Sequence, residues 1–167
     1  NNIELKLSGQ ADIYAYIFIH ITSLLATNST ITFITSNTWL DTSFGCVLKE
    51  FLLDHFNIRA IVASYAEPWF EDVAANTIFI VLDREDNVSK RNNNDVRFIK
   101  LKSKLAELIP QRNLRIESAN RWRRIDDIIR IIDTLHFDQR RSKNIDSNIV
   151  SAEDDNFRIR ITKQKLL

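Results

Sequence analysis

The chain has 167 residues, of which 44% are hydrophobic and 27% charged, a composition typical of one globular domain with its own core. Its single cysteine, Cys46, excludes an intramolecular disulfide and favours a reducing compartment such as the cytoplasm. The net charge of +1 conceals an asymmetry: residues 1–86 hold four basic and eleven acidic side chains, a net charge of −7, whereas residues 87–167 hold nineteen and eleven, a net charge of +8. A basic half suits either a phosphate-bearing partner or an ordinary solvated surface.

Hydrophobic patterns over the first half predict an α/β fold. Residues 12–27 are apolar almost all round and predict a buried helix, and residues 43–55 carry apolar side chains at helical spacing. Residues 31–35, 58–65 and 77–83 are short β-rich or continuously apolar runs, which are typical of buried strands. The order helix, strand, helix, strand, strand predicts a layered sheet with flanking helices.

The second half is predicted to form a smaller α+β extension. The polar stretch 83–95 predicts a loop, residues 96–101 a strand, and residues 102–109 a short helix that Pro110 ends. Residues 119–137 predict an amphipathic helix, whose apolar stripe is Trp122, Ile125, Ile128, Ile129, Ile132 and Leu135. FRIRITK (157–163) alternates apolar and basic side chains, as a half-exposed strand does.

Several function classes find no support in the sequence. The longest apolar run, IYAYIFI (13–19), is shorter than the roughly 20 residues of a membrane-spanning helix, so no membrane partner is expected. The three histidines are widely spaced and form no zinc pattern, so no metal site is expected either. The two glycines, Gly9 and Gly45, cannot supply a Gly-x-Gly cofactor loop, and the two prolines are not adjacent.

A series of short motifs runs through residues 10–85. Asp12-Ile13-Tyr14 opens a helix that ends in Leu24-Leu25, and ITSNTWL (34–40), LKEFL (48–52) and WFEDVAANTIFIVL (69–82) follow in order. The series resembles the C-terminal half of the catalytic domain of adenine-specific DNA methyltransferases, most of all those of type II restriction-modification enzymes. The resemblance implies a partial Rossmann-like methyltransferase fold over residues 1–86 and a basic connecting, DNA-facing region over residues 87–167.

In that family the methyl group of S-adenosylmethionine is transferred to the amino group of an adenine, which must first leave the DNA duplex. By resemblance, Phe70 is the catalytic-site aromatic that stacks on the flipped adenine and Trp69 is its neighbour. From the residues alone, a core position is the plainer interpretation of both rings, and the resemblance reverses it for Phe70 but not for Trp69. Tyr14 and Ile17 are expected to line the cofactor side. The family fold also places its last strand antiparallel between two others, so residues 77–83 should pair between 31–35 and 58–65.

Two motifs of the family lie upstream of this region: a Phe-x-Gly-x-Gly loop for S-adenosylmethionine and an Asn-Pro-Pro-Tyr clamp for the target amine. The glycines and prolines of this chain form neither motif. We therefore expect a fragment of a larger methyltransferase, inactive by itself, whose partners are double-stranded DNA and the missing N-terminal half.

The alternative is a non-catalytic DNA-binding or interaction module of a restriction-modification complex. RWRR (121–124) and QRRSK (139–143) offer candidate phosphate contacts, namely Arg121, Arg123, Arg124, Arg140, Arg141 and Lys143. The plainer interpretation of RWRR is an ordinary helix whose arginines are solvated and whose tryptophan is core. A generic α/β domain of a complex is the third possibility, and the strand order distinguishes it from the first.

Overall fold

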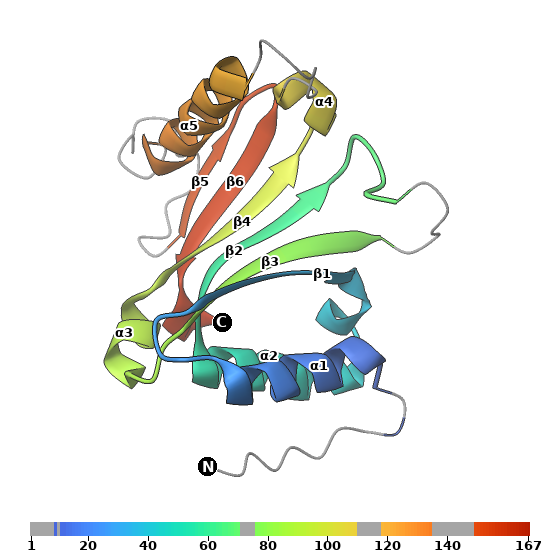
Figure 1. Cartoon of the computed structure of the whole chain (residues 1–167), viewed down its shortest axis with the longest axis vertical. Coiled ribbons are helices and arrows are strands. Elements are labelled where there is room, and N and C mark those ends of the chain that lie inside the picture. Colours follow the sequence, from blue (N-terminus) through green and yellow to red (C-terminus); the bar gives the residue numbers. More distant parts are fainter. Residues whose placement is uncertain (1–8, 10, 71–75, 110–117, 135–148) are drawn as a thin grey trace.

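The computed structural model of the chain describes residues 9, 11–70, 76–109, 118–134 and 149–167 (Figure 1). They form a mixed α/β fold, as predicted, in which helices flank one six-stranded sheet. The strands are β1 (Thr30–Ser36), β2 (Phe56–Ser64), β3 (Thr77–Arg84), β4 (Asp95–Leu101), β5 (Ile149–Glu153) and β6 (Phe157–Lys163). The helices are α1 (Ile13–Leu24), α2 (Ser43–His55), α3 (Val88–Asn93), α4 (Leu105–Leu108) and α5 (Ser118–Thr134), with 3-10 turns η1 (Asn37–Leu40) and η3 (Gln164–Leu166).

The strand order is β1-β3-β2-β4-β6-β5. Strand β3 is antiparallel to both β1 and β2 and lies between them, with Leu82 opposite Ile31 on one side and Ile58 on the other. This confirms the pairing predicted for residues 77–83. Strand β4 then pairs in parallel with β2, so the second half of the chain extends the same sheet across residue 86.

Two apolar clusters pack on opposite faces of the sheet. The first joins α1 and α2 to one face of β2 and β3, where Phe18, Leu48, Phe51 and Ile80 are almost fully buried. The second joins α4 and α5 to the other face of β4 and β6. A bulge between Ile58 and Ala60 shifts the alternation of β2, which explains why Ile58 and Ile61 both enter the first cluster.

Two elements differ from the sequence predictions. The stretch 83–95 is not only a loop, because it contains helix α3. The Asn87 side chain accepts a hydrogen bond from Lys90 N at 3.1 Å, and buried Arg91 donates to Glu85 O at 2.8 Å, so capping and a tertiary contact stabilise a helix that lacks apolar periodicity. Strand β5 was not predicted at all; it is short and lies at the edge of the sheet.

The predicted stripe of α5 does not form one buried face. Ile128 packs against the second cluster, but Trp122 is 65% exposed and Ile129 is also exposed. Ile132 and Leu135 lie outside the residues whose side chains are described. Within the described ranges, no helix is both long and apolar enough to cross a bilayer.

Candidate functional site

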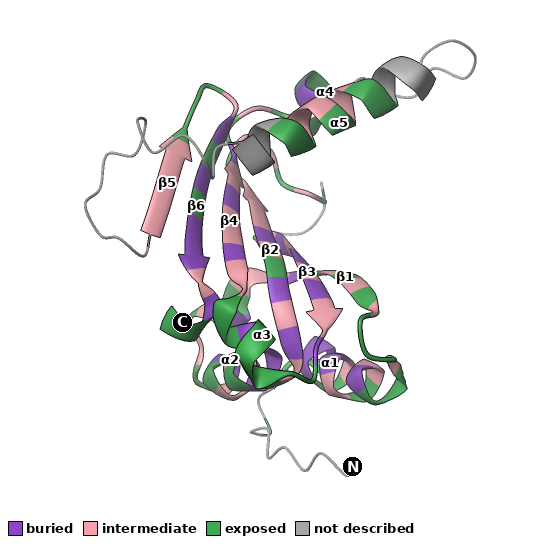
Figure 2. Cartoon of the chain, turned by 90° about the vertical axis from the view of Figure 1, so that its left-hand side faces the viewer, coloured by how far each residue is buried: buried purple, intermediate pink, exposed green. Residues whose placement is uncertain are grey.

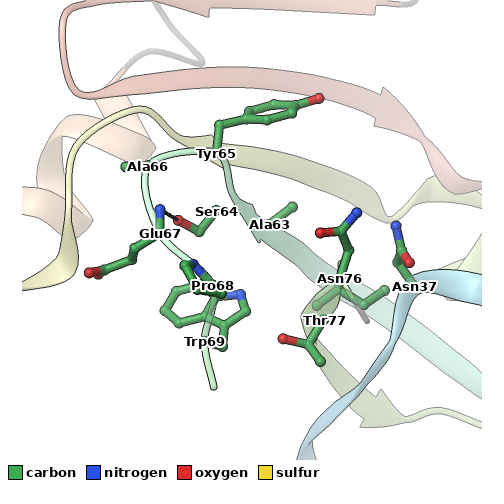
Figure 3. A pocket seen from close by; sticks show the side chains of 11 residues that line it. Asn37, Ala63, Ser64, Tyr65, Ala66, Glu67, Pro68, Trp69, Asn76 and Thr77 are labelled. Atoms are coloured by element: carbon green, nitrogen blue, oxygen red, sulfur yellow. Dashed lines mark hydrogen bonds between the residues drawn. The ribbon is translucent and has the colours of Figure 1, made fainter. Parts of the chain in front are cut away.

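A pocket opens where β1 and β2 end and β3 begins (Figure 3). Its volume is about 370 Å³. The carboxamides of Asn37 and Asn76 lie on one side, and the Trp69 ring and Pro68 lie on the other. The lining is completed by Ala63, Ser64, Tyr65, Ala66, Glu67, Thr77 and Ile78. Loops at the carboxyl ends of sheet strands are the usual position of ligand sites in α/β folds.

Hydrogen bonds from three directions hold the loop that follows β2. Tyr65 N donates to Leu101 O of β4 at 2.9 Å, and Glu67 N donates to Ser64 Oγ at 3.2 Å. The Glu67 carboxylate accepts from Leu105 N at 2.7 Å. On the opposite side of the pocket, Asn37 N donates to Asn76 O at 2.8 Å, which ties the end of β1 to the start of β3. These bonds tie both sides of the pocket to the sheet and to α4.

The two aromatic residues of the loop occupy different environments. Trp69 is half-buried, meets Phe79 edge-to-face at 4.7 Å between ring centroids, and contacts the second cluster. Its Nε1 is buried without a hydrogen-bond partner among the described residues. Phe70 is 47% exposed and so belongs to the surface rather than to the core. Of the two rings, Trp69 lines the pocket and Phe70 is the more exposed.

The two residues expected on the cofactor side, Tyr14 and Ile17, both lie on α1. Tyr14 is buried, packs near Phe44, and its hydroxyl is hydrogen-bonded to Thr38 Oγ1 at 3.1 Å. Ile17 is half-buried on the same helix. Gly45 serves close packing, since a Cβ there would overlap the Trp39 carbonyl oxygen. The expectation that Tyr14 and Ile17 line the cofactor side stays a prediction.

The candidate phosphate contacts are only partly described. Arg140, Arg141 and Lys143 lie outside the described residues, as does the side chain of Arg121. Arg123 is exposed on α5. Arg124 Nε donates to Leu108 O at 3.1 Å and thus links α5 to the end of α4.

Sequence reasoning did not identify several side chains that the fold gathers. Asn37 follows β1 and Asn76 precedes β3, and the predicted antiparallel pairing of these strands was the available signal that the end of β1 meets the start of β3. Lys100, Arg158 and Arg160 line a second cavity on the sheet. The alternation of FRIRITK was the available signal for the two arginines, because alternation places them on one face.

Comparisons with known proteins agree with the fold. Residues 1–70 match the family described as Eco57I restriction-modification methylase. The fold is similar to that of the type IIG restriction endonuclease BpuSI, with a TM-score of 0.60 and 15% sequence identity. That match covers 96% of this chain but only 15% of BpuSI, so the chain spans a small part of the enzyme it matches. The resemblance stated from the sequence is thus confirmed by the match of residues 1–70 to the Eco57I restriction-modification methylase family and by the structural similarity to a type IIG restriction enzyme.

Proposed function

We propose that this chain is part of an adenine-specific DNA methyltransferase of a restriction-modification system, and that its loop 65–70 supplies the wall against which the extruded adenine stacks. The main supporting observation is the strand order: β3 lies antiparallel between β1 and β2, and the loop that joins β2 to β3 starts at a pocket. The family match over residues 1–70 supports the same reaction.

The chemistry requires such a wall because an adenine inside a duplex cannot be reached by an enzyme. Stacking on an aromatic ring contributes about 1–3 kcal/mol per base. Phe70 has an exposed face and follows the pocket residue Trp69 directly in the chain. Asparagine carboxamides suit the amino group and ring nitrogens of adenine, and Asn37 and Asn76 line the pocket.

S-adenosylmethionine would supply the methyl group, and DNA would be the substrate. In this proposal the residues of this chain position the base: the loop stacks on it and the two carboxamides orient it. The cofactor loop and the amine clamp would come from another segment of the same protein, because neither motif is present among these 167 residues.

The test uses the complete protein, unmethylated DNA of mixed sequence and labelled S-adenosylmethionine. Phe70→Ala should lower kcat/KM for methyl transfer about 5- to 150-fold, the equivalent of 1–3 kcal/mol, while the Kd for S-adenosylmethionine changes less than about twofold. Val88→Ala, which shortens an exposed side chain on α3, is the matched control and should leave both values unchanged. Unchanged transfer by Phe70→Ala, or a loss of cofactor binding with it, would remove the stacking role.

The isolated 167-residue chain should transfer no label to DNA. Transfer above background by the pure chain would contradict the proposal that further motifs are needed. DNA binding without any transfer by the complete protein would instead favour the non-catalytic DNA-binding module.

A further inference from the structure

Strands β4 and β6 carry a basic face that is open to solvent. The register pairs Phe98 with Arg160 and Lys100 with Arg158, so these four side chains lie on one face of the sheet. The alternate residues, among them Ile99 and Ile159, lie on the opposite face under α4 and α5. Burial alternates along β6 accordingly, with buried apolar positions and exposed arginines (Figure 2).

This face is hollowed into a groove of about 400 Å³. It is lined by Phe98, Lys100, Ile149, Arg158, Arg160, Thr162, Leu166 and Leu167, and is called here the β4–β6 groove. Of these cations, Arg158 contacts the carboxylate of Glu153 at 3.7 Å, and Glu153 also pairs with Lys102, outside the lining, at 3.1 Å. Arg160 makes no ion pair with the described residues. The lining cations therefore exceed the acidic charge beside them.

A side-chain contact links the groove to the pocket at the ends of β1 and β2. Lys100 Nζ donates to the Tyr65 hydroxyl at 2.5 Å and lies 4.7 Å from the centroid of the Tyr65 ring. Tyr65 is 69% exposed and also lines the pocket. The contact between Tyr65 and Lys100 thus links the lining of the pocket to a cation of the groove.

We propose that the β4–β6 groove binds the phosphate backbone of the DNA strand that carries the target adenine, with Lys100, Arg158 and Arg160 as the contacts. The inference rests on the proposed function, since it takes the pocket as the site of the extruded base. Exposed cations bind a single anion weakly, because solvent screens them. A polyanion is different: each neutralised phosphate releases condensed counterions, so several exposed contacts act together.

The groove is a better candidate for these contacts than the arginines of α5. Helix α5 packs against the opposite face of the sheet through Ile128, and Arg124 is bonded to Leu108 O. The groove is also linked to the pocket through Lys100 and Tyr65, so a backbone lying in it would be near the base that the pocket holds.

The experiment measures binding of a short DNA duplex to the complete protein by fluorescence anisotropy, between about 50 and 200 mM salt. For Arg158→Gln/Arg160→Gln, the slope of log affinity against log salt should become shallower by roughly 1.8, which is about 0.9 for each lost phosphate contact. The control Arg59→Gln/Lys90→Gln removes two comparably exposed cations from β2 and α3, where each is paired with an acid. Its slope should equal that of the unmodified protein, and thermal melting checks that both variants fold.

Methyl transfer by the unmodified protein is measured in parallel, so that the two proposals can fail separately. If the unmodified protein transfers the methyl group but the salt slope of Arg158→Gln/Arg160→Gln is unchanged, the groove does not bind the DNA backbone. The proposed methyltransferase function would still hold. A shallower slope without transfer would support the groove as a DNA surface and overturn the methyltransferase. An equal change of slope in the control variant would mean that the slope responds to the net charge of the protein. The groove would then no longer be assigned as the DNA-binding surface.

Discussion

Replacing Gln164 by leucine should destabilise the fold strongly, because its carboxamide takes the place of a strand beside the start of β2. Strand β4 pairs with β2 only from Ala60 onwards. Before that point, Gln164 Oε1 accepts from Ile58 N at 3.0 Å, and Gln164 Nε2 donates to Phe56 O at 2.7 Å. Asn94 Nδ2 completes the arrangement, since it donates to Ile58 O and to Gln164 Oε1, both at 2.8 Å. Gln164 itself is only 4% exposed.

The size of the loss follows from Ile58 N and Phe56 O, the two backbone groups of β2 that leucine would leave without the Gln164 carboxamide. An unsatisfied buried donor or acceptor costs about 1–3 kcal/mol. Ile58 N and Phe56 O together therefore predict a loss of about 2–6 kcal/mol, out of the roughly 5–15 kcal/mol that holds a domain of this size together. Leucine has nearly the volume of glutamine, so a cavity adds little to this figure.

Urea unfolding of the chain, followed by tryptophan fluorescence, measures the effect as a change in the free energy of unfolding. Lys165→Ala is the matched control, because Lys165 is the exposed neighbour and should change stability by less than about 0.5 kcal/mol. A loss below about 1 kcal/mol for Gln164→Leu would refute the reasoning, since it would mean that water or another group satisfies the backbone atoms equally well.

Two further predictions concern packing and pH. Gly45→Ala should lower the free energy of unfolding by about 1–3 kcal/mol, because the added Cβ overlaps the Trp39 carbonyl oxygen. In the control Gly9→Ala the added Cβ meets nothing within 4 Å, so the same urea titration should show no change. Burial lowers the pKa of His55 below its usual 6.5. As pH falls below 6.5, the unfolded chain therefore binds the proton first and stability declines until the folded-state pKa is passed. Urea midpoints at several pH values between 7.5 and 5 should show this decline, and His55→Gln should flatten it; an unchanged decline in His55→Gln would assign it to other groups.

The main elements of the first half could be predicted from local patterns. Residues 43–55 form α2 with the expected bounds, and the strands 30–36, 56–64 and 77–84 lie within a few residues of their predicted ranges. Apolar periodicity was sufficient for these elements because each of them buries one or both faces. Helix α3 escaped prediction because its stability depends on Asn87 and on the contact between Arg91 and Glu85, and neither produces a periodic pattern.

The site was less predictable than the fold. The resemblance identified the loop with Trp69 and Phe70, but only the β1–β3 register brings Asn37 and Asn76 together across 39 positions of sequence. The prediction for α5 was wrong at Trp122, which is exposed. Helical spacing shows which apolar residues share one side of a helix, but it does not show how much of that side the sheet covers. In the same way, the alternation of β6 predicted that Arg158 and Arg160 share one face, but it could not show that Phe98 and Lys100 of β4 lie beside them.

The charge asymmetry of the sequence acquires a structural meaning once β2 and β4 are known to be partners. The acidic half provides the pocket, and the basic half provides the groove beside it. Parallel pairing sets Ala63 opposite Lys100 and Ser64 opposite Leu101, and Tyr65 continues the contact with its bonds to Leu101 O and to the Lys100 side chain. Pocket and groove are therefore fixed to one sheet rather than to two movable parts. If a base and its backbone bind there, their relative positions are preorganised, and little binding energy is lost in aligning them.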